Sequence, residues 1–349
     1  MHICHVNLAS GFSGGERQTL NLIRSLAAQG LKQTLIAKAG SRLFDEVASL
    51  PVTTRQVNHF LKGHGQGGDW DLIHCHDGKA VYWALLEQLL RKTPYVITRR
   101  VDNPLGKGHL TALAYRRAAT VACLSRAIES VVKSRVADAQ TAIIPSSYSG
   151  FAADADAVDA IRQGFPGKVL VGQVGKLLHH KGFHLTIAAA RQLKDSHPQV
   201  AFLFLGDGPD RQELEAQAAG LDNVHFLGHR QDIGNWLAAL DLLVFPSLSE
   251  GLGSTILEAM QHGVPVIGSR AGGIVDIIQD RKNGLLVETG SGPALTEALR
   301  QLLDDPELGR QLSEAAKQTL DVFAPQRTAQ RYTALYGNCL HDEAKRSKD

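Results

Sequence analysis

The sequence predicts an α/β protein made of two doubly wound domains. Short apolar runs rich in β-branched residues alternate with amphipathic stretches, which is the pattern of βα units that build parallel sheets. The chain has 349 residues, more than one hydrophobic core usually organises. The alternation occurs twice, with a pause of small, polar and acidic residues at 146–167. We therefore expect one domain over residues 1–165, a second over 166–325, and a terminal segment over 326–349.

The individual elements follow from the same alternation. Strands are expected in the first half at 1–9, 33–39, 71–76, 95–100, 120–125 and 141–145, and in the second half at 168–175, 201–208, 224–228, 240–247 and 263–269. Helices are expected at 16–29, 81–91 and 211–219, and a helix-like basic stretch at 107–135. Pro325 is expected to break the helical pattern before an amphipathic segment at 328–340.

Composition restricts the class of protein. Hydrophobic content of 44% and charged content of 21% are those of a folded globular chain. Four scattered cysteines without C-x-x-C spacing suit reduced thiols and a cytoplasmic compartment, and we expect neither a signal peptide nor a membrane span. Residues 1–165 hold 19 Lys and Arg against 13 Asp and Glu, whereas residues 166–349 hold 18 against 22. The basic stretch at 107–135 would attract an anionic membrane or acceptor, or would simply form a solvated helix face.

A glycine-rich loop follows the first predicted strand. Residues 10–16 read SGFSGGE and open a predicted helix. Glycines without a Cβ let backbone N–H groups approach a phosphate closely, and the start of a helix favours an anion. Gly14 and Gly15 are therefore candidates for phosphate contact, although a turn without a ligand explains the loop equally well. The spacing is not the G-x-G-x-x-G of dinucleotide folds, which disfavours an oxidoreductase.

Two lysines follow the first strand of the second half. Lys176 and Lys181 stand after a strand and ahead of a helix, so both ammonium groups can reach a diphosphate. Lysines in solvent are the alternative. His179 and His180, between them, have diverging side chains and do not predict a metal site. The turn GDGP at 206–209 follows the next strand, and a nucleotide can pass over it unless the turn is purely structural.

The segment PSLSEGLGSTILEAM, at 246–260, is the richest in the chain. Glu250 lies beyond the carboxyl end of a strand, where open α/β sheets bind ligands, and its carboxylate can accept hydrogen bonds from sugar hydroxyls. The glycines beside it expose N–H groups that can hold phosphate oxygens. Glu258 has capping-box spacing from Thr255, so it could satisfy helix N–H groups instead. A further glycine turn, AGGIVD at 271–276, follows the next strand.

In the first half, charged residues end two strands. His74, His76 and Asp77 close one strand, and Arg99, Arg100 and Asp102 end the next. Histidines at i and i+2 of a strand point the same way, but we find no third ligand at useful spacing. We therefore expect His76 or Asp77 to face a ligand, predict no metal, and expect the arginines to make this wall positive.

Together these motifs resemble the family 4 glycosyltransferases, which are retaining enzymes of the GT-B fold. The resemblance covers nearly the whole chain through SGGER, GKLLHHKG, GDGP, VHFLGH, the E-x7-E of Glu250 and Glu258, and AGGIVD. It implies two Rossmann-like domains that face a central cleft, with the acceptor bound by residues 1–165 and the nucleotide sugar by 166–325. The segment 326–349 would be a helix that crosses back to the N-terminal domain and ends in a frayed tail.

The resemblance also implies roles for individual residues. Lys176 and Lys181 match the basic pair that neutralises the donor diphosphate, although the family more often has arginine at the first place. Glu250 matches the carboxylate that holds donor-sugar hydroxyls, and Glu258 the one that grips the ribose. The implied donor site is completed by Gly14, Gly15, Gly206, Leu227, Gly228, Gly251, Leu252 and Gly253, with His229 near the base.

One departure from the family concerns the strand at 95–100. Many members carry a histidine at its end, near the reacting sugar, where this chain has Arg99 or Arg100. Either the loop of His76 and Asp77 supplies the equivalent contact, or an arginine serves a different donor or an anionic acceptor. We accordingly place His76 with Glu250 and the two lysines in the expected catalytic set, and Asp77, Arg99 and Arg100 on the acceptor side.

The expected activity is a cofactor-free, metal-independent hexosyl- or N-acetylhexosaminyltransferase. Its donor would be a nucleotide diphosphate sugar, UDP before GDP, and its acceptor a cell-envelope glycan, lipid-linked sugar or lipopolysaccharide. We expect no nucleic-acid partner and a possible peripheral contact with the anionic inner face of a membrane. The alternatives are a sugar-nucleotide epimerase or phosphorylase on the same fold, or an inactive binding protein, against which the presence of both glutamates and both lysines counts.

Overall fold

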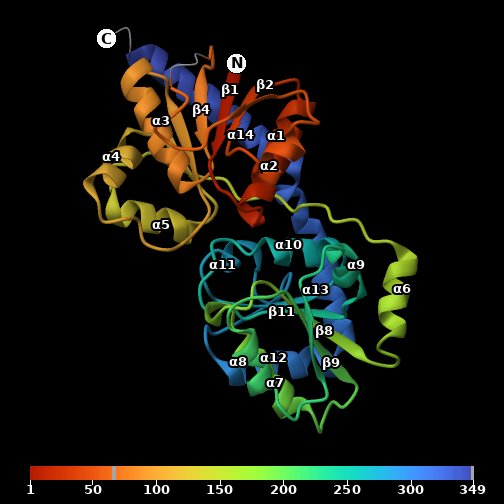
Figure 1. Ribbon diagram of the computed structural model, residues 1–349. Coiled ribbons are helices and arrows are strands. Elements are labelled where there is room, and N and C mark those ends of the chain that lie inside the picture. The colour runs from red at the N-terminus through yellow and green to blue at the C-terminus, as the bar shows by residue number, and fades with distance from the viewer. Residues whose placement is uncertain (65–67, 347–349) are drawn as a thin grey trace. The chain divides into compact units, whose positions relative to one another are not determined.

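The computed structural model describes residues 1–64 and 68–346 and divides into two compact units. The first unit comprises Met1–Ser149 and the chain from Phe323 onward, and the second comprises Gly150–Val322. Each unit has its own parallel sheet covered by helices (Figure 1). The prediction of two Rossmann-like α/β domains is therefore confirmed.

The sheet of the first unit has the strand order β3-β2-β1-β4-β5-β6-β7. Its strands are β1 (His2–Asn7), β2 (Lys32–Ala37), β3 (Thr53–Gln56), β4 (Leu72–Cys75), β5 (Tyr95–Arg99), β6 (Thr120–Cys123) and β7 (Thr141–Ile143). The order reverses between β1 and β4, so the loops that follow these two strands diverge and leave a crevice at the sheet's carboxyl edge. This switch point is where a ligand of the first unit is expected.

Within the described residues, six helices belong to the first unit. They are α1 (Gly14–Ala28), α2 (Arg42–Val47), α3 (Gly78–Arg91), α4 (His109–Arg117), α5 (Arg126–Arg135) and α14 (Pro325–Arg346). The basic stretch at 107–135, expected as one helix-like segment, is two helices because the buried run of β6 lies between them. Within the described residues, no helix combines the length and the apolar character that a bilayer span requires.

Helix α14 returns to the first unit after the chain has formed the second. It runs beside α1 (Figure 1), and its Tyr332 and Tyr336 are buried in one cluster with Leu22 and Leu26 of α1. The predicted return of the C-terminal helix is therefore confirmed. Pro325 begins this helix, where the missing N–H of proline costs nothing, rather than breaking one.

The sheet of the second unit has the strand order β10-β9-β8-β11-β12-β13. Its strands are β8 (Val169–Val174), β9 (Val200–Leu205), β10 (Val224–Gly228), β11 (Leu242–Phe245), β12 (Val266–Ser269) and β13 (Leu285–Val287). The helices are α6 (Ala155–Gln163), α7 (Phe183–Leu193), α8 (Arg211–Gln217), α9 (Ile233–Ala239), α10 (Ser254–Gln261), α11 (Ile274–Ile277), α12 (Gly292–Asp304) and α13 (Pro306–Thr319), with short 3-10 helices η1 (His179–Lys181) and η2 (Leu320–Phe323). The switch point lies between β8 and β11.

The boundary between the units falls at residue 149, not at 165 as the diluted pattern suggested. Helix α6 packs against α9 of the second unit. The Arg162 guanidinium donates to both carboxylate oxygens of Asp241 at 2.7 and 2.8 Å, and Asp241 also accepts from Leu170 N at 2.7 Å. These contacts tie the expected linker to the second unit, which sequence periodicity missed because α6 has no fully buried residue.

Candidate functional site

The carboxyl edge of the second sheet brings two predicted residues together at the switch point. Lys181 lies in η1 after β8, and Glu250 follows the neighbouring strand β11. Lys181 Nζ lies 2.5 Å from Glu250 Oε2, and the two side chains are 21% and 15% exposed. Ligands of open α/β sheets bind outside the carboxyl ends of the strands at such a point. A cation and a carboxylate thus stand side by side where one polar ligand can reach both.

The backbone around Lys181 is held close to β11. The Gln173 amide donates to the Lys181 carbonyl oxygen at 2.8 Å. Gly182 has a φ of 74°, and a Cβ there would lie 2.1 Å from the Pro246 carbonyl oxygen. Only glycine permits both the left-handed conformation and this approach. The glycine after Lys181 therefore allows the loop beyond β8 to touch the end of β11.

The glycine turn at 271–273 supports the loop that carries Glu250. Gly273 N donates to the Glu250 carbonyl oxygen at 2.9 Å. A Cβ on Gly272 would lie 1.9 Å from that same oxygen, and a Cβ on Gly273 would lie 2.3 Å from the Gly251 carbonyl oxygen. The sequence suggested only another glycine loop. Its contact with the loop of Glu250 follows from the pairing of β11 with β12, which the sequence pattern does not reveal.

The turn at 206–208 packs against the loop that begins at Gly175. A Cβ on Gly206 would lie 1.9 Å from the Gly175 carbonyl oxygen, and one on Gly208 would lie 2.2 Å from that of Leu177. Gly206 N donates to the Gly228 carbonyl oxygen at 2.8 Å, which joins this turn to the end of β10. The structural reading of these glycines therefore has direct support, and nucleotide contact by Gly206, Leu227 and Gly228 stays a prediction.

The structure tests whether Glu258 forms a capping box with Thr255 at the start of a helix. Helix α10 begins at Ser254, and its N-cap is Gly253, which has a φ of 91° and no side chain to accept a hydrogen bond. Thr255 therefore lies inside the helix, and the capping-box alternative for Glu258 is wrong. Glu258 stands in the second helical turn and is only 4% exposed. Lys176 differs from its predicted partner Lys181 in being exposed.

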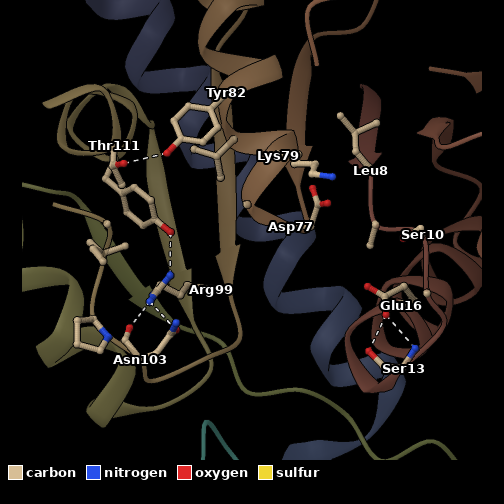
Figure 2. Close-up of a pocket in the computed structure, with 18 residues that line it drawn as sticks. Leu8, Ser10, Ser13, Glu16, Asp77, Lys79, Tyr82, Arg99, Asn103 and Thr111 are labelled. Atoms are coloured by element: carbon tan, nitrogen blue, oxygen red, sulfur yellow. Dashed lines mark hydrogen bonds between the residues drawn. The ribbon is translucent and has the colours of Figure 1, made fainter. Parts of the chain in front are cut away.

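A cavity of about 670 Å³ lies at the switch point of the first unit. It opens between the loop after β1 and the helices and loops that follow β4 and β5 (Figure 2). Two predicted residues, Asp77 and Arg99, line it together with Ser10, Gly11 and Ser13 of the glycine-rich loop. Sequence reasoning missed other polar lining residues, which sit on or near α3 and α4: Lys79, Tyr82, Asn103, Thr111 and Tyr115.

Asp77 and Arg99 face this cavity in well-defined positions. Asp77 is the N-cap of α3 and accepts from Ala80 N at 2.7 Å. Burial raises the pKa of Asp77. Hydrogen bonds from the backbone N–H groups of Ala80 and Leu8 lower this pKa and partly oppose the effect of burial. The Arg99 guanidinium donates to Tyr115 Oη at 3.3 Å and to the carbonyl and side-chain oxygens of Asn103 (Figure 2).

Glu16 closes the glycine-rich loop at the start of α1. Its Oε2 accepts from Ser13 N at 2.9 Å and from Ser13 Oγ at 2.7 Å (Figure 2). The Arg100 side chain lies beneath this loop, because a Cβ on Gly15 would be 3.6 Å from Arg100 Cδ. Gly14 is exposed. A phosphate contact by Gly14 or Gly15 therefore stays a prediction.

His76 does not line this cavity and belongs to a buried cluster of three histidines. His5 of β1 pairs with His74 of β4, and His76 follows two residues later, so the fold supplies the third imidazole that the sequence did not reveal. One nitrogen from each ring lies within 4.8 Å of the others. Each of the six ring nitrogens has a partner, and those outside the three rings are Gln33, Thr98, Tyr336 and Arg100. A hydrogen-bond network explains the cluster better than a metal site, since a guanidinium adjoins it.

Burial lowers the pKa of all three histidines. The pKa of His5 falls to about 4, although Gln33 opposes the change, and those of His74 and His76 fall well below their ordinary value. The rings are therefore neutral at ordinary pH. Arg100 Nη2 lies 3.3 Å from His76 Nδ1, which joins the two candidates for the missing family histidine in one unit.

Comparisons with known proteins place this chain among glycosyltransferases. The model for glycosyl transferases group 1 matches residues 157–319, and that for glycosyltransferase family 4 matches residues 12–147. The 2-deoxystreptamine glucosyltransferase of Streptomyces kanamyceticus is 32% identical over 272 residues, which cover 68% of this chain and 69% of the relative. The lipopolysaccharide core biosynthesis glycosyltransferase LpsE of Rhizobium meliloti is 27% identical over 341 residues, 92% of this chain and 94% of the relative.

Solved structures share the fold. HepE of Anabaena, in complex with UDP and glucose, has a TM-score of 0.83 at 21% identity over 97% of this chain and 100% of its own. WaaG, a glycosyltransferase involved in lipopolysaccharide biosynthesis, has a TM-score of 0.67 at 20% identity over 95% of this chain and 98% of its own. Both identities are low, so these likenesses concern the architecture alone.

We predict that Gly272→Ala destabilises the second unit by roughly 2 kcal/mol or more, because the new Cβ adds a backbone clash to a left-handed conformation. Gly290→Ala is the matched control. Its φ of 77° resembles the 51° of Gly272, but its nearest neighbour is Leu248 Cδ2 at 3.7 Å. The control should lower the free energy of unfolding by only about 1 kcal/mol, the cost of a left-handed conformation for a residue with a Cβ. Urea unfolding measures both, and equal losses would contradict the support assigned to Gly272.

Proposed function

The chain belongs to family 4 of the glycosyltransferases, and we propose that it moves a hexose or N-acetylhexosamine, with retention, from a UDP-sugar to a glycan of the cell envelope. The ion pair of Lys181 and Glu250 at the second switch point carries this proposal. Its ammonium suits a diphosphate, and its carboxylate suits sugar hydroxyls. A nucleotide diphosphate sugar presents both groups next to each other.

In the absence of a ligand, Lys181 and Glu250 neutralise each other. A diphosphate competes with the carboxylate for the Lys181 ammonium, because both offer charge-assisted hydrogen bonds. The donor sugar then offers hydroxyls to the Glu250 carboxylate in exchange. The site is thus prepared for the donor without leaving either partially buried charge unpaired beforehand.

The other donor contacts follow from the carboxyl edge of the second sheet. Exposed Lys176 adds a second cation to the diphosphate, and buried Glu258 is proposed to bind the ribose. The turn at 206–208 and the end of β10 at 227–228 are joined by a backbone hydrogen bond and would border the base. UDP as the nucleotide has the support of HepE, whose structure contains UDP and glucose.

The proposed reaction breaks the bond between the sugar and the diphosphate and forms a bond to an acceptor hydroxyl oxygen on the same face of the sugar, while the hydroxyl proton passes to the departing diphosphate. The developing charges are a cationic sugar carbon and an anionic diphosphate. Lys176 and Lys181 stabilise the diphosphate as it leaves, which is the task that a divalent metal performs in other sites. We therefore propose a reaction that does not depend on a metal.

The acceptor is proposed to bind in the cavity of the first unit. Its volume of about 670 Å³ lies in the range of small-molecule sites. The Asp77 carboxylate can accept hydrogen bonds from hydroxyls of the sugar acceptor, while Arg99 makes the site suitable for an acceptor that carries a negative charge. Both Arg99 Nε and Arg100 Nε are buried and have no hydrogen-bond partner within the described ranges 1–64 and 68–346. The lipopolysaccharide roles in the names of LpsE and WaaG support a cell-envelope acceptor.

A peripheral contact with the inner face of a membrane would bring the enzyme to such an acceptor. Helices α4 and α5 expose five basic residues, Arg116, Arg117, Arg126, Lys133 and Arg135. Arg135 donates to the Lys107 carbonyl oxygen at 2.7 Å, which ties α5 to the loop before α4. Leu110, on the same α4, is 55% exposed. Basic and apolar side chains together suit an anionic bilayer surface.

The nucleotide preference is tested by thermal shift with UDP, GDP and ADP, all in the presence of EDTA. We expect UDP to raise the Tm most, because a ligand stabilises the state that binds it and the lysines require no metal. A Tm rise that appears only after Mg²⁺ is added would contradict metal-free binding. A larger effect of GDP would replace UDP as the assigned nucleotide.

The role of Glu250 is tested by Glu250→Gln. We expect the variant to bind UDP but to lose about 100-fold or more in transfer rate, because a charged partner of the reacting sugar is removed. Product analysis by NMR measures transfer and anomeric configuration, and a donor that changes without an acceptor would indicate an epimerase. Glu288→Gln, an exposed residue of the same unit, is the control with the same change of charge. Unchanged turnover of Glu250→Gln would remove the assigned role.

Membrane contact is tested by sedimentation with vesicles of increasing anionic lipid content. The double variant Arg116→Gln, Arg117→Gln should bind such vesicles several-fold more weakly, because each basic residue near the surface contributes to the attraction. Arg300→Gln, Arg310→Gln changes the same charge on two arginines of the second unit whose side chains are 42% and 58% exposed, and it should bind as the parent does. Binding that does not depend on anionic lipid would contradict the proposal.

A further inference from the structure

We infer that Gln33 fixes, through His5 and His76, the proton positions that hold the Arg100 guanidinium beneath the Gly14 and Gly15 loop. The inference gives Gln33 and the two histidines a positioning role, and its effect on turnover rests on the proposed function. The four residues come from β2, β1, the end of β4 and the end of β5, and they form one chain of hydrogen bonds. Both ends of this chain have a fixed orientation, because the Arg100 guanidinium can only donate and the Gln33 amide is held by a second contact.

At one end, a second hydrogen bond fixes the Gln33 amide. Its Nε2 donates to the Ile23 carbonyl oxygen of α1 at 3.2 Å. The reversed amide would set two oxygens against each other, so Oε1 must face His5. Gln33 is 2% exposed, and water cannot take over either contact. Residue 33 therefore presents an acceptor, and not a donor, to the histidine cluster.

The acceptor on Gln33 sets the tautomers of both histidines. His5 Nε2 lies 3.0 Å from Gln33 Oε1, so this nitrogen carries the proton. A neutral imidazole has one donor and one acceptor, which leaves His5 Nδ1 as an acceptor. His76 Nε2 lies 3.0 Å from that nitrogen and must donate to it. His76 Nδ1 is consequently the free acceptor at the far end.

Arg100 uses this acceptor. Its Nη2 lies 3.3 Å from His76 Nδ1, and its Nη1 lies 3.5 Å from Ser146 Oγ. Arg100 can only donate, so the opposite His76 tautomer would set N–H against N–H. Burial lowers the pKa of Arg100, and the charge of Glu16 at the glycine loop opposes this. An acceptor nitrogen on His76 thus holds a buried cation at a fixed place under the loop.

The neighbouring His74 does not disturb this chain. Its two nitrogens bind Tyr336 Oη at 2.7 Å and Thr98 Oγ1 at 2.6 Å, and these hydroxyls can donate or accept. His74 therefore adapts to either tautomer and transmits no preference to His5. The proton positions between Gln33 and Arg100 are therefore set by the rings of His5 and His76, which lack such freedom.

The first experiment reads the tautomers directly in the free protein. Long-range 1H–15N NMR distinguishes protonated from unprotonated imidazole nitrogens, and His5→Asn and His76→Asn variants assign the signals. We expect a protonated Nε2 and an unprotonated Nδ1 in both rings. A proton on His76 Nδ1, or a doubly protonated ring near neutral pH, would overturn the inference. This reading needs no donor or acceptor, so it holds even if transfer is never observed.

The second experiment compares two substitutions of similar shape at residue 33. Gln33→Met removes the acceptor that favours a proton on His5 Nε2. Gln33→Glu keeps an oxygen toward His5, and its buried carboxyl group, in the protonated form, can donate to the Ile23 carbonyl oxygen in place of the amide. We expect Gln33→Met to lower kcat for transfer about tenfold, the effect of losing one hydrogen bond to a charged group, and to perturb the His76 Nδ1 signal. Gln33→Glu should retain most of the parental rate and the parental tautomers.

The outcomes separate positioning from mere packing. Equal losses in the two variants would show that shape at residue 33 matters and would overturn the inference, as would full activity of Gln33→Met. The Tm shift with UDP should stay parental in both variants, because the donor residues belong to the second unit. If the parent protein bound UDP but transferred no sugar, the proposed function would fail while the NMR result still decided the tautomers.

Discussion

The loops at the carboxyl edge of the second sheet are held together by backbone segments that approach so closely that a Cβ atom at the contact would clash. The loop after β8 touches the end of β11 at Gly182, and the loop after β11 rests on the turn after β12 at Gly272 and Gly273. Lys181 and Glu250 meet because these approaches bring their loops together. The glycines that resemble phosphate-binding signals in the sequence thus also serve to assemble a charged pair, and these two roles cannot be separated by spacing alone.

In the first unit the cation, the Arg100 guanidinium, lies partly inside the protein and needs a hydrogen-bond partner there. Arg100 is held by a neutral imidazole, which accepts a hydrogen bond without cancelling the charge. A carboxylate in place of His76 would bind the guanidinium more strongly but would leave no net charge for a ligand. A neutral acceptor keeps the arginine in place and its positive field available at the switch point.

Much of the fold could be predicted from the sequence, because buried parallel strands are nearly continuous apolar runs. The edge strands β3 and β13 were missed since one is polar and the other has three residues. Glu250 was identified with Lys181 because each lies in a loop that follows a strand. The partnership of Gln33, His5 and His76 could not be predicted, because it arises from the register of three strands far apart in the chain. The capping alternative for Glu258 was wrong, since the residue before the helix is a glycine.

The return of helix α14 makes the second unit an insertion within the first. Tyr336 binds His74, and Tyr332 binds Thr98, so the interior of the first unit is completed by residues that follow the entire second unit in sequence. During synthesis, the strands of the first unit emerge early but lack this wall until the last part of the chain is made. The second unit, Gly150–Val322, is contiguous in sequence, so all of its residues are synthesised before α14 and it can fold to completion on the ribosome.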